Sequence, residues 1–470
     1  MVDLTVWTAP LTSPVHLLSK VFFNMPLATA AEAANAPLVL AGVLLSLIVI
    51  YFASKLVGEL CLRINLPPVL GELIAGVIVG ISALNLLVFP DGEQGFHSLI
   101  LDLLQATAGL EQQSVQAVAG SISEIVSVLS EIGVIILLFE IGLESDLKEL
   151  LRVGPQAAVV AVVGVAVPFV AGTLGLVFGF GVPPVPAIFA GAALTATSIG
   201  ITAKVLAEIG RLSSREGQII IGAAVLDDVL GIIVLAVVAS LAKTGEIRIG
   251  NIIYLIISAT VFLIGAILLG RLLSPYFVAL VDKMQTRGQL LISSLIFAFA
   301  LSYIGAAIQL EAILGAFAAG LVLAETEKRA ELEEQVIPIA DMFVPIFFVV
   351  VGAKTDVSVL NPLDPANREG LIIAGFLVVV AILGKLVTGA VVFGQDKINR
   401  LAIGIGMIPR GEVGLVFAGV GAATGVLSDA LDAAIIVMVI LTTFLAPPLL
   451  RLAFQREDTS ENLESVPESK

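Results

Sequence analysis

Two adjacent aspartates, Asp227 and Asp228, lie in the stretch 219–242, which is otherwise almost wholly apolar. Ionisable groups are costly inside a membrane and usually mark a functional site there. On a helix, adjacent side chains point about 100° apart, so these carboxylates cannot share one partner equally. Desolvation and mutual repulsion favour the protonated form of at least one of the two carboxyl groups, which can then carry a proton. Carboxylate oxygens are also natural ligands of hard cations. One group that holds either a proton or a cation such as Na⁺ or Li⁺, but never both, is the minimum requirement for antiport. A structural aspartate pair bonded to helix ends and water is the alternative interpretation.

Lys385 lies in a second apolar stretch, 371–393. An isolated ammonium there is untenable, so the side chain must meet a carboxylate or lose its proton. Asp227 and Asp228 are the mid-span acids best placed to serve as that partner. A lysine that extends to the membrane surface is the alternative interpretation.

Hydroxyl side chains gather at Thr195, Thr197 and Ser198, in the run 194–202 that also contains glycine. This pattern favours a broken helix whose free carbonyls and hydroxyls line a cation pathway. Ordinary packing of small residues against a neighbouring helix is the competing interpretation.

A second broken helix is predicted at 408–414, where Pro409 removes a helix hydrogen bond. Arg410 and Glu412 flank a glycine there. The two charged residues either neutralise the dipoles of half-helices or contact the ion directly, and both roles stay open. Two broken helices at matching positions of a chain are the best sequence indication of a transport site.

The composition places these groups in a membrane. Of the 470 residues, 58% are hydrophobic and 13% charged, with a mean hydropathy of +1.08. A soluble domain has more charge and fewer apolar residues, so we expect an all-α integral membrane protein. The net charge of −15 argues against nucleic-acid binding, and the single cysteine excludes an internal disulfide.

About thirteen transmembrane helices are predicted, since about 20 mainly apolar residues cross a bilayer. We expect an N-terminal extension at 1–37, a segment outside the bilayer at 91–122 and a disordered acidic cytoplasmic tail at 455–470. The predicted spans lie near 38–61, 67–89, 123–144, 154–180, 185–209, 216–242, 250–272, 286–308, 311–326, 335–355, 370–394, 396–424 and 429–453.

Lysines and arginines in the short loops fall mainly on one side of this topology, from Arg63 to Arg451. Basic loops favour the cytoplasmic side, which predicts an outer N-terminus and a cytoplasmic C-terminus. The host membrane is a bacterial plasma membrane by default, and an internal energy-coupling membrane is the alternative.

Four matched segments indicate an internal repeat over 38–242 and 286–453, with 250–272 as a linker helix. An odd number of spans between the matches predicts opposite topology of the two halves. The matched pairs are 70–76 with 314–320, Gly142 with Gly352, 170–172 with 387–389, and 199–201 with 413–415.

Over residues 38–453 the chain resembles the monovalent cation:proton antiporter superfamily, and most closely the bacterial thirteen-span Na⁺/H⁺ antiporters of the two-aspartate type. The motifs that carry the resemblance are Asp227-Asp228, Ala196-Thr197-Ser198, Gly384-Lys385 and Arg410-Gly411-Glu412.

The resemblance implies a homodimer without cofactor or enzymatic activity, which exchanges Na⁺ (Li⁺ possible) for H⁺ by elevator-type alternating access. It implies two crossed discontinuous helices and electrogenic exchange. Asp228 would be the main cation ligand and proton carrier, with Na⁺ also near Asp227 and Thr197, and Lys385 would pair with Asp227. Dimer-domain helices would span 38–144 and 286–355, and core helices 154–242 and 370–453.

Three other functions stay open at this point. A K⁺/H⁺ antiporter would use the same fold with a different cavity size. An intramembrane aspartyl protease also has two buried aspartates, but on separate spans and with one in a Gly-x-Gly-Asp motif, whereas these two are adjacent and the motif is absent. An anion or organic-solute symporter is the remaining possibility.

Overall fold

The computed structural model describes residues 30–90, 95–108, 112–244, 249–361, 367–393 and 398–464. Helices make up almost all of this part of the chain, and its only β-type pairing is an isolated bridge between Pro90 and Phe96. Nine of the described helices are long and apolar enough to cross a membrane. Most of the expected N-terminal extension lies outside the described residues.

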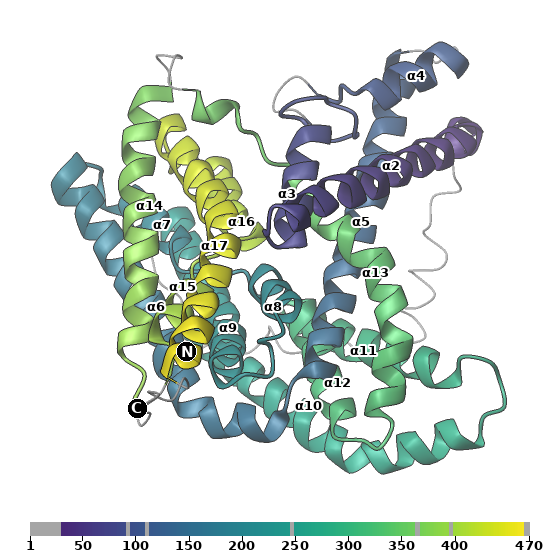
Figure 1. The fold of residues 1–470 in the computed structure, drawn as a ribbon. Coiled ribbons are helices and arrows are strands. Elements are labelled where there is room, and N and C mark those ends of the chain that lie inside the picture. Colours follow the sequence, from purple (N-terminus) through teal and green to yellow (C-terminus); the bar gives the residue numbers. More distant parts are fainter. Residues whose placement is uncertain are drawn as a thin grey trace, which may run out of the picture.

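The helices form two bundles that pack side by side (Figure 1). In the first bundle, α5 packs on α12 and α13, α2 packs on α3, and α10 lies along the edge. Its helices are α2 (Ala30–Arg63), α3 (Pro68–Val79), α4 (Leu99–Ala108), α5 (Gln112–Glu144), α10 (Ile249–Lys283), α11 (Gln289–Ala307), α12 (Ala312–Ala324) and α13 (Arg329–Ala353).

The second bundle holds the polar residues singled out above. Here α6 packs on α9 and α14, and α14 packs on α17. Its helices are α6 (Leu147–Phe180), α7 (Pro184–Ala193), α8 (Ile199–Glu208), α9 (Arg215–Thr244), α14 (Asn367–Ala390), α15 (Arg400–Gly406), α16 (Glu412–Ala423) and α17 (Asp429–Glu464), and the short η3 (Ser358–Leu360) precedes α14. Helix α8 lies between the bundles and contacts α3 and α5 of the first.

Glycines allow backbones of the first bundle to approach closely. A Cβ added at Gly76 of α3 would lie 2.8 Å from the Cα of Gly352 in α13. A Cβ added at Gly320 of α12 would lie 2.8 Å from the Cα of Gly142 in α5. Since a side chain would separate the helices, these four positions fix two close helix pairs.

Some helix ends differ from the hydropathy-based expectations. The span expected over 67–89 is helical only from Pro68 to Val79, because the chain turns at Gly80, where an added Cβ would lie 2.3 Å from the backbone of Ala353. Helix α5 starts at Gln112, inside the segment expected to lie outside the bilayer. Helix α17 continues to Glu464, because no glycine or proline interrupts residues 455–464 of the expected disordered tail.

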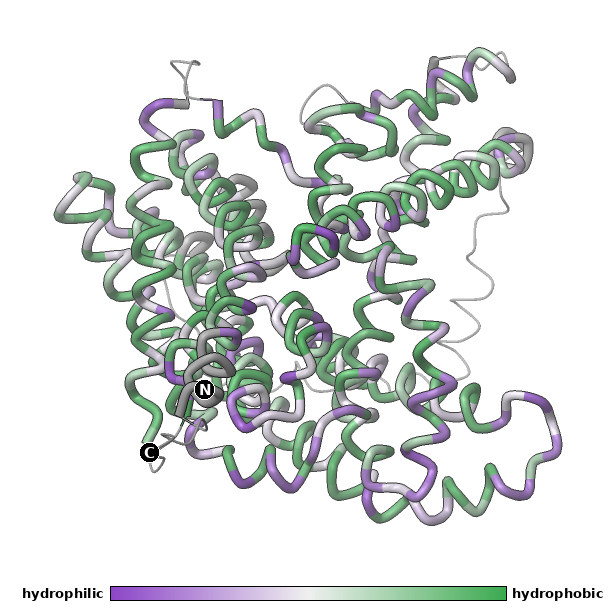
Figure 2. The backbone as a smooth tube through the Cα atoms, viewed as in Figure 1, coloured by the Kyte–Doolittle hydropathy of each residue, from purple (hydrophilic) through white to green (hydrophobic). Residues whose placement is uncertain are grey.

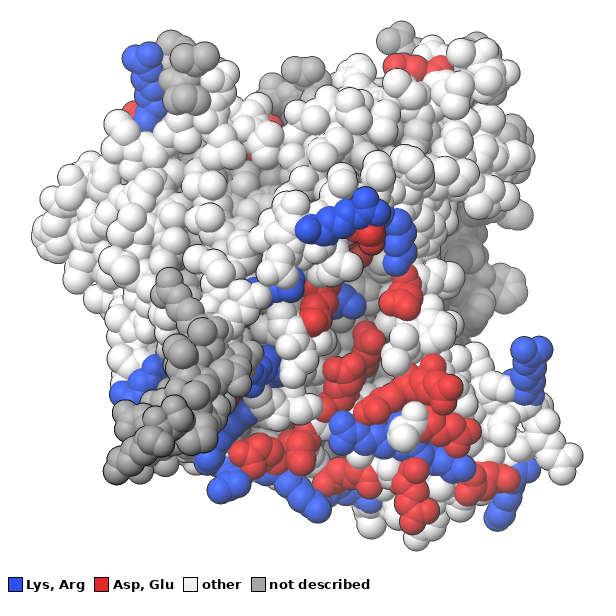
Figure 3. Space-filling view, in the orientation of Figure 1, with Lys and Arg blue, Asp and Glu red and all other residues white. Residues whose placement is uncertain are grey.

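Hydrophobic residues cover most of the helices, as the tube coloured by hydropathy shows (Figure 2). Charged side chains gather mainly in the lower half of the space-filling view, while much of its upper half is uncharged (Figure 3). Large apolar side chains are exposed along α10, for example Leu268 at 61% and Leu272 at 64%. Surfaces of this kind are stable in contact with lipid or with another protein chain.

Candidate functional site

Two helices of the second bundle are interrupted near their middle. The first break separates α7 from α8 at residues 194–198. The Thr195 hydroxyl donates to the carbonyl of Ala192 at 2.7 Å, and Ser198 has an extended backbone with ψ of 101°. Hydroxyl side chains that bond to nearby backbone compete with helix formation, which explains a break at this point of an apolar segment.

The second break separates α15 from α16 at residues 407–411. Pro409 has no N–H to continue the helix, and it also disfavours helical geometry at the preceding residue. Helix α15 begins at Arg400 and is capped by the preceding Asn399, whose side chain accepts from the N–H of Ala402. Both breaks predicted from the sequence are therefore present.

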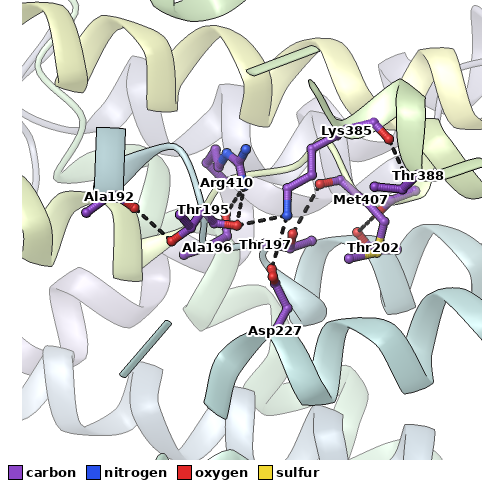
Figure 4. A network of polar contacts seen from close by, with 11 residues as sticks. Ala192, Thr195, Ala196, Thr197, Thr202, Asp227, Lys385, Thr388, Met407 and Arg410 are labelled. Atoms are coloured by element: carbon purple, nitrogen blue, oxygen red, sulfur yellow. Dashed lines mark hydrogen bonds and ion pairs between the residues drawn. The ribbon is translucent and has the colours of Figure 1, made fainter. Parts of the chain in front are cut away.

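The two interrupted segments cross at their breaks. The N–H of Ser198 donates to the carbonyl of Pro409 at 2.8 Å. The Thr197 hydroxyl donates to Met407 O at 3.1 Å, and the Thr202 hydroxyl donates to Gly406 O at 2.8 Å (Figure 4). Each half-helix end thus satisfies backbone groups of the other segment, as non-helical backbone at membrane depth requires.

Lys385 reaches this crossing from α14 (Figure 4). Its Nζ donates to the carbonyl oxygen of Thr195 at 2.8 Å and lies 3.3 Å from Oδ2 of Asp227 on α9. Lys385 and Asp227 are both 0% exposed, so the ion pair is shielded from solvent. The surface-extended lysine considered above is therefore wrong for this structure.

Arg410 is the second buried cation of the site. It is 0% exposed, and its Nη1 donates to the carbonyls of Thr195, at 3.1 Å, and Ala196. These carbonyls follow the C-terminal end of α7, where a cation is favoured by the helix dipole. The guanidinium thus balances the partial negative charge of the carbonyls at the first break, although Arg410 itself belongs to the second break.

Asp228 follows Asp227 on α9 and is 5% exposed. Both aspartates are close enough to Lys385 to interact with it electrostatically. Ser198 is also buried, and its hydroxyl lies 2.7 Å from where a Cβ on Gly411 would be. Glu412 is the first residue of α16, and its side chain lies outside the described part of the structure.

Sequence reasoning missed two contributors. The first is Thr202, whose hydroxyl bonds to α15 at the crossing. Thr202 belongs to the hydroxyl-rich run, but it was not singled out within that run. Glu208, at the end of α8, accepts from the N–H of Val69 at 3.2 Å and so joins α8 to the start of α3 in the first bundle. No local sequence pattern predicts the contact between Glu208 and Val69, because the two residues are 139 positions apart in the chain.

A buried Asp–Lys pair at crossed half-helices is the arrangement that the sequence resemblance implied. Residues 27–455 match the family model described as sodium/hydrogen exchanger, transmembrane. The chain belongs to this family. Its members are transporters, so an enzymatic role such as the aspartyl protease considered above is excluded.

Two proteins similar to this chain are named as cation/H⁺ antiporters. The high-affinity Na⁺/H⁺ antiporter NhaS3 of Synechocystis sp. is 71% identical over 432 residues, which cover 91% of this chain and 94% of the relative. The Na⁺/H⁺-K⁺ antiporter GerN of Bacillus cereus is 34% identical over 416 residues, covering 87% of this chain and 95% of GerN.

The fold matches a solved antiporter. The sodium proton antiporter MjNhaP1 from Methanocaldococcus jannaschii has a TM-score of 0.59 to this chain at 17% sequence identity, covering 90% of this chain and 98% of MjNhaP1. At that identity, the likeness concerns the fold alone.

Proposed function

We propose that this protein is a secondary Na⁺/H⁺ antiporter in which Na⁺ and H⁺ compete for Asp228. The observation that carries the proposal is the buried Asp227–Lys385 pair at the crossing of the two broken helices. Carboxylates suit Na⁺ as hard oxygen ligands and also accept protons. Because one carboxylate cannot hold both ions at once, occupation by one releases the other.

Asp228 and Asp227 supply the negative charge of the proposed cation site, and Thr197 supplies a neutral oxygen. The Thr197 hydroxyl uses its hydrogen in the bond to Met407 O. Its oxygen therefore keeps lone pairs for a cation. In this proposal Arg410, together with Glu412 at the start of α16, compensates the partial charges of the helix dipoles at the half-helix ends.

Lys385 acts in this proposal as the internal cation that Na⁺ replaces. In the structure its ammonium neutralises Asp227 at 3.3 Å. A Na⁺ ion that binds the two aspartates would repel the ammonium and favour its deprotonation. Lys385 would then release a proton besides the one carried by Asp228, which makes the exchange electrogenic with more H⁺ than Na⁺ per cycle.

The two bundles have the roles of dimer and core domains in this proposal. The reciprocal glycine contacts, Gly76 with Gly352 and Gly320 with Gly142, support an inverted repeat, because Gly320 is the matched counterpart of Gly76 and Gly142 that of Gly352, so each contact repeats the other. In this proposal the nine long helices, together with α3, α12 and the two interrupted pairs, would make thirteen crossings. Alternating access would move the second bundle against the first, in a homodimer held together by the first.

The basic loops support an outer N-terminus and a cytoplasmic C-terminus. The proposed host is a plasma membrane or an internal energy-coupling membrane of the cell. The name of GerN also includes K⁺, which gives K⁺/H⁺ exchange on the same fold as the second candidate.

An ion series in proteoliposomes tests the proposed substrate. With an inside-acid pH gradient and a pH-sensitive dye, Na⁺ or Li⁺ added outside should dissipate the gradient. A response to K⁺ alone would keep the exchange mechanism and change the substrate. No response to any of the three ions would overturn the proposed function.

A further inference from the structure

Two cavities lie next to each other at the C-terminal end of α13. The first, of about 270 Å³, is enclosed by α5, α13 and the residues that begin α12. The second, of about 110 Å³, is enclosed by α3, α13, α17 and the second helix break. Val351 and Lys354 line both, so the last turn of α13 forms the wall between them.

The two cavities lie near the segments that carry the helix breaks. Val134 and Phe347 of the first cavity lie 3.6 and 3.5 Å from where a Cβ on Gly200 would be, and Gly200 follows the first break. The second cavity is lined by Gly411, which belongs to the second break, and by Thr443, whose hydroxyl donates to the carbonyl of Arg410. The first cavity therefore approaches α8, which follows the first break, and the second cavity reaches the second break.

Lys354 is held at the common end of these cavities. Its Nζ donates to the Ser127 hydroxyl of α5 at 2.9 Å and lies 5.3 Å from the centre of the Phe89 ring. Two contacts from different segments fix the position of the ammonium. Within the described part of the chain, no other lysine or arginine lines either cavity.

Acidic side chains face the same space. Glu131 and Glu311 line the first cavity, and Asp356 lines the second. The Lys354 ammonium and the Glu131 carboxylate line the same cavity, where their opposite charges attract. Asp356 accepts from the N–H of Ser358, the first residue of η3.

We propose that Lys354 is the electrostatic barrier on the route by which cations reach the aspartates from this face of the membrane. We call this face, which carries the C-terminal end of α13, the Lys354 face. A fixed positive charge lowers the local concentration of cations and slows their entry. Lys354 thereby weakens Na⁺ uptake from the Lys354 face while leaving the opposite face unaffected. This inference rests on the proposed exchange and adds that Na⁺ uptake differs between the two faces of the membrane.

The test measures Na⁺-driven proton flux separately from each face. The full-length protein is reconstituted in proteoliposomes that are sorted by the accessibility of a C-terminal affinity tag. In Lys354→Gln, the half-saturating Na⁺ concentration on the Lys354 face should fall about tenfold, because the repulsion is removed. The value on the opposite face and the maximal rate should stay as in the wild type.

Three variants separate charge from structure. Lys354→Arg keeps the charge and should keep the wild-type value. Arg368→Gln removes an exposed charge at the start of α14 that lines neither cavity, and it should change nothing. Glu131→Gln removes the opposing carboxylate and should raise the half-saturating concentration on the Lys354 face, which tests the inference even where Lys354→Gln folds poorly.

The outcomes are distinct. An unchanged half-saturating concentration in both Lys354→Gln and Glu131→Gln, with active wild type, would overturn the barrier and leave the proposed exchange intact. Equal changes on both faces would also overturn it, because they would indicate an effect on the ion site itself. An inactive wild type would overturn the proposed function, and the inference with it.

Discussion

Lys385 Nζ lies 3.3 Å from Asp227 Oδ2, and neither side chain is exposed. The same ammonium donates to the carbonyl of Thr195 at the first helix break, so one cation connects α9, α14 and the crossing. A buried ion pair is a weak source of stability, because desolvation offsets much of the attraction. Removing one partner is costly, however, since the other is left as an uncompensated charge.

Lys385→Ala should destabilise the protein by about 3–5 kcal/mol, the usual cost of leaving one partner of a buried pair unmatched. The loss should be visible as a lower thermal midpoint in detergent and should be accompanied by weakened or uncoupled exchange. The double variant Lys385→Ala with Asp227→Asn removes both charges and should recover part of the stability. A double variant less stable than Lys385→Ala would contradict this account of the pair.

Arg410→Gln should reduce Na⁺-driven proton flux at least about tenfold, as expected when a buried charged hydrogen-bond network is broken. The guanidinium serves the carbonyls of Thr195 and Ala196 at once, and a glutamine amide cannot replace its charge. Arg410→Lys should recover only part of the rate, because an ammonium lacks the forked geometry. Wild-type flux in Arg410→Gln would show that the first break is held by other groups.

Gly352→Ala should destabilise the first bundle by about 1–3 kcal/mol, the typical effect of overpacking. The added Cβ would lie 2.2 Å from the carbonyl oxygen of Leu73, so α3 and α13 must move apart. Gly265→Ala on α10 is the matched control, because no atom lies within 4 Å of its added Cβ. It should be neutral or stabilising by up to about 1 kcal/mol, and equal thermal midpoints for both variants would exclude tight packing at Gly352.

The candidate site was largely predictable because charged residues are rare in apolar spans. Asp227, Lys385 and Arg410 are recognisable by their type and depth alone, and the structure brings all three to the crossing. The breaks were also predictable, since Pro409 cannot donate and hydroxyls compete for the backbone.

Local turns and long-range contacts were not predictable in the same way. Hydropathy does not register that the chain turns at Gly80, where the backbone of Ala353 leaves no room for a side chain. The contact of Glu208 with the N–H of Val69 depends on how two bundles meet, and a single sequence carries no signal for it.

The exchange of ions at Asp228 is the centre of this account. The most direct measurement imposes an inside-acid pH gradient across proteoliposomes, adds Na⁺ outside, and follows a pH-sensitive dye for wild type and Asp228→Asn. Matched thermal midpoints establish that both proteins are folded. We expect Na⁺ to collapse the gradient in the wild type and to have no effect in Asp228→Asn. Full Na⁺-driven flux in Asp228→Asn would contradict the proposed mechanism.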